Sequence, residues 1–391
     1  MTAPLATAAR LEARALTLPV AAAAGVLVGE RLGPGRGWPA LALAGACLLC
    51  LSLARGLGAA RGQVLGAGVL VALAAVSTQR ALDGVAGSPL AAAARVGCLG
   101  VITGRLVDDP DPSRFTTRAR LRASHFDCIE PVGGRPAPTT DTAGTDTAGA
   151  HLDHLDAHVA VMAREGAAAR LRLLSAGELV VLEGRLGPLG PRDAWLRRRH
   201  AVAGFDARDL LDARPARGPL PRVAQALRGV VTGGIRDLPP DRRALTAGVL
   251  LGDTRDLPRA AVDDFRASGL SHLVAVSGAN VAFVLALVGP ALARLGLRGR
   301  FVAGLAVLVL FGAATRWEPS VLRAVGMAGT AMLATLLGRP QDGLRIFAVA
   351  VTALLLADPF LLGDVGFQLS CAASVGIVVL AVTAWFIDLP I

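Results

Sequence analysis

Residues 265–289 read FRASGLSHLVAVSGANVAFVLALVG, a stretch long enough to span a bilayer, since about 20 apolar residues suffice. Its first half nevertheless carries Ser268, His272, Ser277 and Asn280. Polar groups in hydrocarbon are costly, so they normally face a bundle interior, a partner or a water-filled path. In a single helix Ser268 and His272 would share a narrow arc, with Asn280 at its edge. We expect these side chains to line a polar path through the membrane; simple hydrogen bonding to neighbouring helices is the alternative.

The composition makes this Asn unusual. The chain has 391 residues with no Lys and no Tyr, and Asn280 is the only Asn, a pattern typical of a strongly GC-rich coding bias. The chain is 53% apolar with a mean hydropathy of +0.54, which excludes an ordinary soluble protein. The net charge of +10 comes from Arg alone, and Arg suits both membrane anchoring and phosphate contacts.

Three apolar runs occupy the first 83 residues, at roughly 16–28, 40–53 and 64–76. The first two are short for a full span, so flanking residues or a thin local bilayer must help. No compelling cleavage site makes the first run a signal peptide. We predict three membrane helices with the N-terminus inside, although the Arg counts of the short loops barely separate the two orientations. Three crossings place the following domain outside the cytoplasm.

Residues 84–237 show a different pattern, with no apolar run long enough to span a membrane. Segments such as LGVITGRL (99–106), FTTRARLRA (115–123) and ELVVLEGRL (178–186) alternate with a period of two between Gly, Pro and Asp. This alternation is typical of half-buried strands. Five short strands in this stretch predict a small soluble antiparallel β-barrel with an OB-like fold.

One of these strands carries a row of arginines. The predicted core-facing residues are Phe115, Ala119 and Leu121, and the predicted outward-facing residues are Arg118, Arg120 and Arg122. Three arginines on the face of an OB strand suit contact with a DNA phosphate backbone. A solvated strand face in a protein without Lys is the alternative.

Two cysteines of this domain are predicted to form a disulfide. Cys98 begins the first strand and Cys128 follows the second, so antiparallel pairing would bring them together. Both lie in the segment placed outside the membrane, where oxidation is possible. Cys47 and Cys50, in contrast, lie in an apolar run without a redox context, which favours helix packing.

The motif HLDHLDAH (151–158) superficially suggests a metal site. Its spacing matches no known zinc pattern, no Cys supports it, and it follows a low-complexity stretch. We therefore predict no metal and no cofactor. The chain also has no Walker A loop, HExxH, G-x-S-x-G or paired catalytic carboxylates, so we do not expect an enzyme.

Residues 238–391 return to membrane character. The stretch 239–257 predicts a helix that begins after two prolines and ends near Gly252, as an interfacial or re-entrant element. Four further apolar runs follow at about 301–314, 321–337, 346–356 and 365–386. We therefore expect a polytopic α-helical membrane protein into which the β domain is inserted.

Two arginines and a glutamine belong to these last runs. Pro319 fits the first turn of a helix with Glu318 just before it, which places Arg323 one turn inside a membrane segment. An intramembrane Arg is a functional-site hypothesis by default; a buried pair with Glu318 or Asp364 is the alternative. Arg316 would project in a similar direction if the helix extended back. The candidates for a polar channel lining are Ser268, His272, Ser277, Asn280, Arg316, Arg323 and Gln368.

Four blocks carry a resemblance to a known family. LLGDTRDLP (250–258), FRASGLSHLVAVSGANVAFV (265–284), EPSVLRAVGMA (318–328) and DPFLLGDVGFQLSCAASVGI (358–377) are similar, in this order, to segments of the ComEC-type DNA internalisation family. Membrane helices followed by a β-rich soluble domain are also the layout of that family's N-terminal part.

The resemblance implies a multi-pass protein of the inner membrane that passes single-stranded DNA into the cytoplasm during natural transformation. It also implies membrane lipid, a DNA receptor and an ATPase as partners. The sequence does not decide between a monomer and an oligomer. The family's metallo-β-lactamase-like nuclease domain is not in these 391 residues, so we expect a shortened or partial family member. A polytopic small-solute transporter or receptor with an extracytoplasmic β domain is the alternative.

Overall fold

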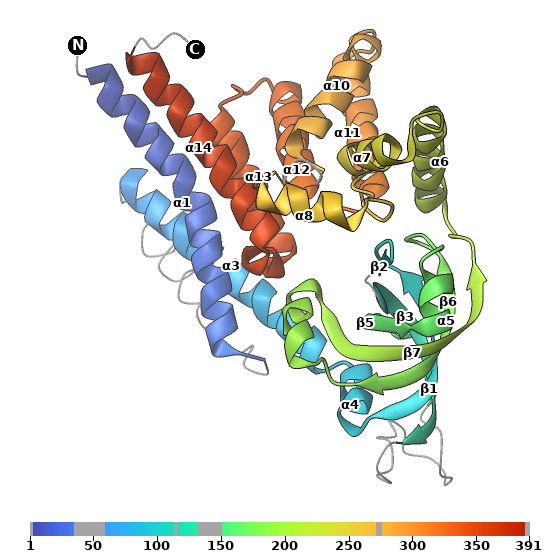
Figure 1. The fold of residues 1–391 in the computed structure, drawn as a ribbon. Coiled ribbons are helices and arrows are strands. Elements are labelled where there is room, and N and C mark those ends of the chain that lie inside the picture. Colours follow the sequence, from blue (N-terminus) through green and yellow to red (C-terminus); the bar gives the residue numbers. More distant parts are fainter. Residues whose placement is uncertain (1–2, 35–58, 113–115, 132–150, 271–275, 388–391) are drawn as a thin grey trace. The chain divides into compact units, whose positions relative to one another are not determined.

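The computed structural model describes residues 3–34, 59–112, 116–131, 151–270 and 276–387. The chain divides into two compact units (Figure 1). One, the helical unit, combines residues 1–83 with 275–391, and the other, the sheet unit, comprises residues 84–274. The predicted membrane run at 40–53 lies outside the described residues.

The helical unit places the predicted apolar runs in helices. Pro319 opens a helix directly after Glu318, as predicted, and Asp342 caps the next helix by accepting hydrogen bonds from the backbone N–H groups of Leu344 and Arg345. The described helices of this unit are α1 (Ala3–Leu32), α3 (Ala59–Ala86), α10 (Gly278–Leu292), α11 (Leu297–Ala314), α12 (Pro319–Leu336), α13 (Gly343–Ala357), the short 3₁₀ helix η2 (Pro359–Gly363) and α14 (Val365–Ile387).

Helix α12 lies at the centre of the packing, because it contacts α10, α11, α13 and α14. One apolar cluster joins α10, α11 and α12 through residues such as Val281, Phe311 and Val325. A second cluster joins α1 and α3 to α13, η2 and α14. Helix α12 therefore contacts helices that precede it in the sequence, α10 and α11, and helices that follow it, α13 and α14.

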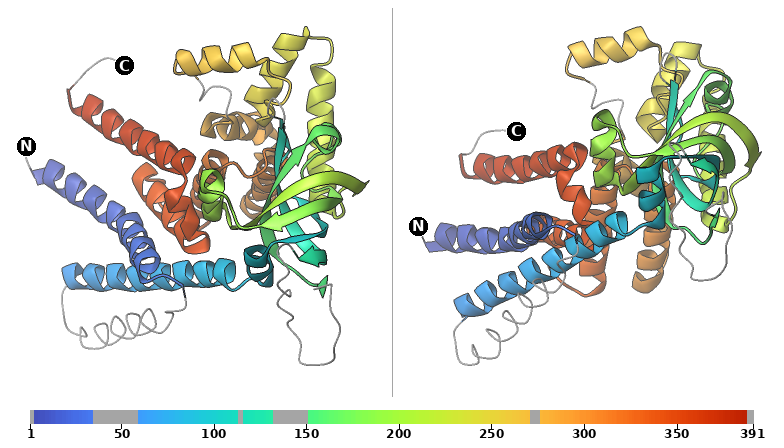
Figure 2. Two further views of the ribbon diagram at one scale, coloured as in Figure 1. Left: turned by 60° about the horizontal axis from the view of Figure 1, so that its bottom comes forward. Right: turned by 90° about the horizontal axis from the view of Figure 1, so that it is seen from below.

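Small residues allow α1 and α3 to approach closely at the point where the two helices cross in Figures 1 and 2. A Cβ atom built at Gly25 would lie 2.7 Å from the Cβ of Ala74, and one built at Gly29 would lie 2.6 Å from the Cβ of Thr78. Real Cβ atoms do not come so near. Gly25 and Gly29 thus form the G-x-x-x-G spacing by which membrane helices bring their backbones together.

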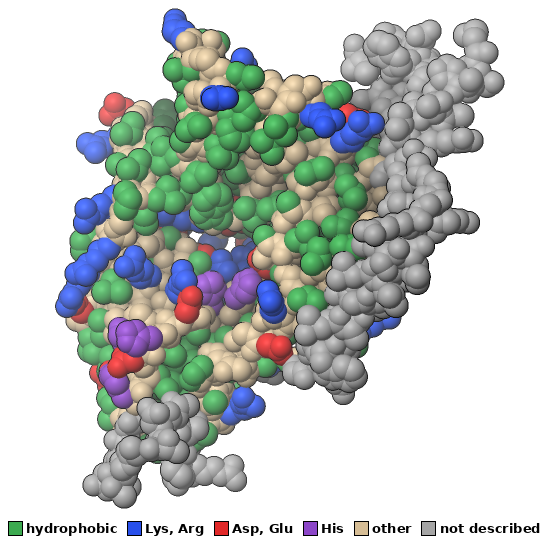
Figure 3. Space-filling view, turned by 180° about the vertical axis from the view of Figure 1, so that it is seen from behind, with side chains coloured by type: hydrophobic (Ala, Val, Ile, Leu, Met, Phe, Trp, Pro, Cys, Tyr) green, Lys and Arg blue, Asp and Glu red, His purple; other side chains and the backbone are tan. Residues whose placement is uncertain are grey.

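Four helices among the described residues are long and apolar enough to cross a membrane, at 15–32, 66–86, 297–314 and 319–336. Helices α10 and α13 and the first part of α14 are apolar but shorter. Large apolar side chains are exposed on this unit, including Phe283 and Leu287 at 72% and 82%. Figure 3 shows hydrophobic side chains spread over the outer surface of the helices. Such exposure suits contact with lipid rather than water.

The sheet unit contains a mixed sheet of seven strands. Its described elements are α4 (Pro89–Val96), β1 (Cys98–Leu106), β2 (Asp111–Pro112), β3 (Thr116–Pro131), β4 (His151–Leu152), β5 (Ala157–Arg164), α5 (Glu165–Leu171), β6 (Leu179–Gly187), the 3₁₀ helix η1 (Pro191–Arg199), β7 (Ala201–Arg214), α6 (Pro219–Gly234), α7 (Pro240–Leu251) and α8 (Arg259–Ala267). The strand order is β1-β6-β7-β5-β3-β2, β4 pairs with β3, and β1 also pairs with β3.

One pairing corrects the prediction of a purely antiparallel sheet. Strands β5 and β7 run parallel, whereas the other pairings are antiparallel. A parallel pair requires a crossover connection rather than a tight hairpin, and here the chain between β5 and β7 contains α5, β6 and η1. Period-two alternation reports which face of a strand is buried and carries no information about its direction.

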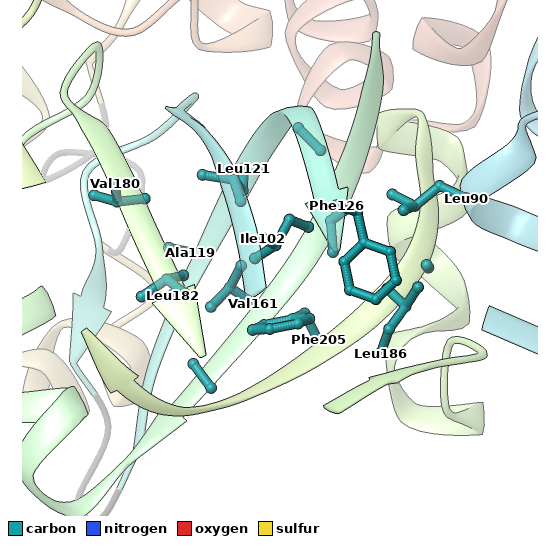
Figure 4. Close-up of a cluster of buried hydrophobic side chains, with 14 of the residues drawn as sticks. Leu90, Ile102, Ala119, Leu121, Phe126, Val161, Val180, Leu182, Leu186 and Phe205 are labelled. Carbon is teal, nitrogen blue, oxygen red and sulfur yellow. The ribbon is translucent and has the colours of Figure 1, made fainter. Parts of the chain in front are cut away.

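The core of this unit follows the predicted alternation. Phe126, Leu121 and Phe205 are among its fully or almost fully buried members, and Figure 4 shows these side chains gathered inside the strands. Ala119 is buried, as predicted, whereas Phe115 lies outside the described residues. Leu90 of α4 and Leu171 of α5 complete the core.

Helix α7 occurs where the sequence predicted it, from Pro240 to Leu251, with Gly252 in the left-handed conformation at its C-cap. The register of β1 and β3 also brings the two cysteines together. Cys98 and Cys128 form a disulfide with their Cα atoms 5.8 Å apart. Their placement outside the cytoplasm stays a prediction.

We predict that Gly25→Leu weakens the packing of α1 on α3. The larger side chain collides with α3, and overpacking costs about 1–3 kcal/mol. The thermal midpoint of the detergent-solubilised protein should fall, while Gly66→Leu should leave it unchanged because a Cβ at Gly66 has no neighbour within 4 Å. Equal midpoints for both variants would contradict the close approach.

We further predict that Cys98 and Cys128 resist thiol alkylation in unreduced membranes. The disulfide spans a separation of 30 residues, and its reduction should lower the stability of the sheet unit by about 3–4 kcal/mol in the chain-entropy model. Mass tagging with a maleimide measures the free thiols. Cys98→Ser is the control, since it should expose Cys128 to the reagent. Rapid labelling of both wild-type thiols would rule out the bridge.

Candidate functional site

The polar stretch 265–289 is not a single helix, which corrects the prediction that Ser268 and Asn280 share one helical arc. Helix α8 ends at Ala267, and Gly269 has a φ of +72°. Glycine adopts this left-handed conformation readily, so the helix can stop there. Helix α10 starts afresh at Gly278, after Ser277 in an extended conformation.

Arg323 occupies the second turn of α12 and is only 9% exposed. Its Nε donates to the Oγ of Ser370 on α14 at 2.8 Å, and its Nη1 lies 2.9 Å from the Sδ of Met327. No carboxylate among the described residues forms an ion pair with it. The predicted alternative of a pair with Glu318 or Asp364 is therefore wrong.

The same guanidinium lies against the start of α10. A Cβ built at Gly278 would lie 3.3 Å from the Nη2 of Arg323 and 3.3 Å from the Cβ of Ala324. Ser320, one turn earlier on α12, donates from its Oγ to the carbonyl of Val276 at 2.7 Å. The absence of a side chain at Gly278 thus lets α10 begin next to Arg323.

The other predicted lining residues lie in different settings. Ser268 is exposed at the end of α8 and bonds to the carbonyl of Asp264. Asn280 is half-buried in the first turn of α10. Gln368 is exposed and donates to the carbonyl of Leu362. His272 lies outside the described residues.

Arg316 differs from its predicted position. The helix does not extend back to it, because Arg316 and Trp317 have φ values of 61° and 54° in the turn between α11 and α12. Of the predicted lining residues, the structure brings Arg323 next to the SGAN segment (277–280). It also adds Ser370, which the sequence argument did not include.

The arginines of β3 face outward, as predicted, and two of them already have acidic partners. Arg120 donates to Asp108 at 2.5 and 2.6 Å, and Arg122 to Asp156 at 2.5 and 2.7 Å. The hydrogen bond from Arg122 lowers the pKa of Asp156 below its ordinary value. Arg118 lies opposite Asp111 in the backbone register of β3 and β2. This strand face therefore carries much less net positive charge than its arginines suggest.

The histidines of residues 151–158 lie on strands and a turn. His151, on β4, bonds to Asp127 and Asp153, and the hydrogen bond with Asp127 raises the pKa of His151 above its ordinary value. His158, on β5, lies 6.0 Å from His200 between ring centres, and burial lowers its pKa. Figure 3 shows histidine and acidic side chains next to one another on one face. Among the described residues no group of three has the arrangement of a metal site.

A buried ionic cluster in the sheet unit was missed by the sequence argument. It consists of Asp109, Arg228, Asp253 and Arg255. The Nη2 of Arg228 lies 2.9 Å from Asp109 and 2.8 Å from Asp253, and Arg255 bonds to Asp253 at 2.7 and 2.9 Å. The cluster joins the loop after β1 to α6 and to the segment after α7.

Each charge in this cluster has partners. Burial would raise the pKa of Asp253, but the hydrogen bond from Arg255 and the charges of Arg255 and Arg228 outweigh it and lower that pKa. Arg228 also donates to the carbonyl of Leu251, and Arg255 to that of Leu174. Asp253 and Arg255 of the GDTRD motif (252–256) were the sequence signal for this cluster. Their partners Asp109 and Arg228 are distant in the sequence, so the signal could not identify them.

Comparison with known proteins bears on both sites. Residues 249–386 match the family described as Competence protein. The match spans the end of the sheet unit and the later part of the helical unit. It includes Asp253 and Arg255 of the ionic cluster, the SGAN segment and Arg323.

Two relatives match at significant levels. ComE operon protein 3 of Bacillus subtilis (strain 168) is 29% identical over 143 residues, which cover 36% of this chain and 18% of the relative. The uncharacterized protein YcaI of Escherichia coli (strain K12) is 29% identical over 140 residues, covering 33% of this chain and 18% of the relative. The match thus spans less than a fifth of either relative. No solved structure matches the chain.

We predict that Asp253→Asn strongly destabilises the sheet unit. The change leaves Arg228 and Arg255 buried with one carboxylate between them, and breaking a buried ion pair costs about 3–5 kcal/mol. Denaturant unfolding of the purified protein measures this loss. Asp263→Asn is the matched control, because Asp263 forms only an exposed pair with Arg266 at 3.6 Å, and such pairs contribute about 0–1 kcal/mol. Similar losses in both variants would contradict a special role of the cluster.

Proposed function

We propose that this chain is a membrane component of DNA uptake during natural transformation and that its helical unit passes single-stranded DNA across the inner membrane. The observation that carries the proposal is the match of residues 249–386 to the Competence protein family. The matched segment contains α10 to α13 and most of α14, and within it a buried guanidinium without a carboxylate partner among the described residues. Intramembrane charges of this kind mark substrate or ion pathways.

The proposal assigns the sheet unit to an OB-like barrel outside the cytoplasm. Its five long strands pair in a ring, β1 to β3, β3 to β5, β5 to β7, β7 to β6 and β6 to β1, which supports a closed sheet. Helix α5 between β5 and β6 also fits an OB-like fold. The disulfide supports an oxidising compartment. OB-like domains bind single strands in many proteins, but the acidic partners of Arg120 and Arg122 limit what those two residues contribute.

In this proposal the chain has no catalytic activity of its own. Binding of DNA outside the cell and the energy of transport are then functions of receptor and ATPase components. The protein acts within the lipid bilayer, as a monomer or an oligomer.

We predict that Asn280→Ala and Arg323→Ala reduce transformation in a naturally transformable host that carries the complete gene. For Arg323, loss of a charge-assisted contact costs about 1.5–3 kcal/mol, which corresponds to a reduction of roughly 10- to 100-fold. Transformant counts and uptake of labelled DNA measure the effect, and immunoblots of membranes verify insertion. The exposed Arg300→Ala is the control.

Deleting the complete gene from the transformable host tests the function itself. The deletion strain should take up no DNA into the cytoplasm. Normal transformation of this strain, together with loss of uptake of a small solute, would refute the proposal and support the transporter alternative.

A further inference from the structure

Helix α10 starts with unsatisfied positive character. The first N–H groups of a helix have no acceptor within it, and the aligned peptide dipoles add a partial positive charge there. Ser277 precedes the helix, but its side chain makes no capping hydrogen bond, and the first turn contains no acidic residue. Among the described residues, neither a side-chain cap from Ser277 nor a carboxylate in the first turn neutralises this helix N-terminus.

Arg323 brings a full positive charge to the same place. Its Nη2 lies near Gly278, 3.3 Å from the position that a Cβ would take. Its Nε and Nη1 are occupied by a hydroxyl and a thioether, and a thioether sulfur is a weak acceptor. Among the described residues Nη2 has no hydrogen-bond partner, and no carboxylate pairs with the group.

This arrangement is unfavourable without an anion. Burying an ion without a counter-charge is costly, and here Arg323, which is nine-tenths buried, places its guanidinium beside the first residue of α10. The cost disappears when an oxyanion lies between them, because backbone N–H groups at a helix N-terminus and a guanidinium fork both donate to phosphate oxygens.

We propose that the N-terminus of α10 and the guanidinium of Arg323 form a binding site for one phosphate oxyanion, defined here as the α10 phosphate site. This inference rests on the proposed function, under which the phosphate belongs to the backbone of single-stranded DNA. Arg323 is buried between α10, α12 and α14, and its contact with Ser370 turns it toward other helices. This placement favours a strand within the protein over a headgroup in the surrounding lipid.

Gly278 sets the room available in this site. An Ala at this position would bring its Cβ to 3.3 Å from both Nη2 of Arg323 and the Cβ of Ala324. That separation is tighter than nine in ten real Cβ contacts. A branched side chain would therefore occupy the space next to the guanidinium and displace a phosphate even with the charge retained.

The test uses the full chain purified in a maltoside detergent, which contains no phosphate, and a fluorescent ten-residue oligothymidylate. Arg323→Gln should weaken binding about 10- to 100-fold and reduce the salt slope by about 0.7. Gly278→Val should weaken binding without changing that slope. Arg323→Lys should retain the slope with lower affinity, and the exposed Arg300→Gln should resemble the wild type.

Thermal unfolding without ligand separates binding from a structural role. An uncompensated buried charge destabilises the empty protein, so Arg323→Met should raise the midpoint and abolish the further rise that the oligonucleotide gives to the wild type. A lower midpoint combined with unchanged oligonucleotide affinity would show that Arg323 only supports packing, which overturns the site.

Lipid is distinguished by competition. Short-chain phosphatidylglycerol should not displace the oligonucleotide at concentrations below its micelle formation. If the lipid binds in an Arg323-dependent way and the oligonucleotide does not, the site is a headgroup site and the proposal is wrong. Unchanged oligonucleotide affinity in Arg323→Gln, in a protein whose deletion abolishes transformation, overturns the α10 phosphate site alone. Normal transformation of the deletion strain overturns the proposed function instead.

Discussion

A buried charge needs a partner, and the two units of this protein meet that constraint in opposite ways. In the sheet unit Arg228 and Arg255 share the carboxylates of Asp109 and Asp253. In the helical unit Arg323 is similarly buried, yet its partners among the described residues are a hydroxyl and a thioether. The first arrangement stabilises a fold at neutral net charge. The second arrangement retains a net positive charge, and the binding of an anion at this site would explain why that charge is buried there.

Close helix packing is what makes such a position possible. Gly278 allows α10 to begin beside Arg323, while Gly25 and Gly29 allow α1 to approach α3. Helices in lipid gain little from the hydrophobic effect on association, so they depend on close packing and on hydrogen bonds between helices. The bonds from Ser320 to Val276 and from Arg323 to Ser370 are of this second kind.

The sheet unit shows why charge counts alone do not identify a nucleic-acid surface. A row of three arginines on β3 suggests phosphate contacts, but Arg120 and Arg122 each hold an aspartate from a neighbouring loop. These two arginines are therefore less available to bind a phosphate than an unpaired guanidinium would be. The same unit uses the disulfide between Cys98 and Cys128 to fix β1 on β3.

The sequence by itself determined the local elements of this protein. Two prolines and Gly252 bounded α7, Pro319 opened α12, and alternation identified the strands and the burial of Ala119 and Leu121. These signals are local, because capping and periodicity act within a few residues. The family resemblance followed from ordered motifs and was confirmed over residues 249–386.

Only the tertiary structure decided which residues meet. It broke the stretch 265–289 at Gly269, paired β5 with β7 in parallel, and joined Asp109 to Arg228 across 119 residues. It also left Arg323 without the carboxylate that Glu318 or Asp364 would have supplied. Such contacts depend on the packing of distant segments in three dimensions, and neither hydrophobic period nor motif spacing contains that information.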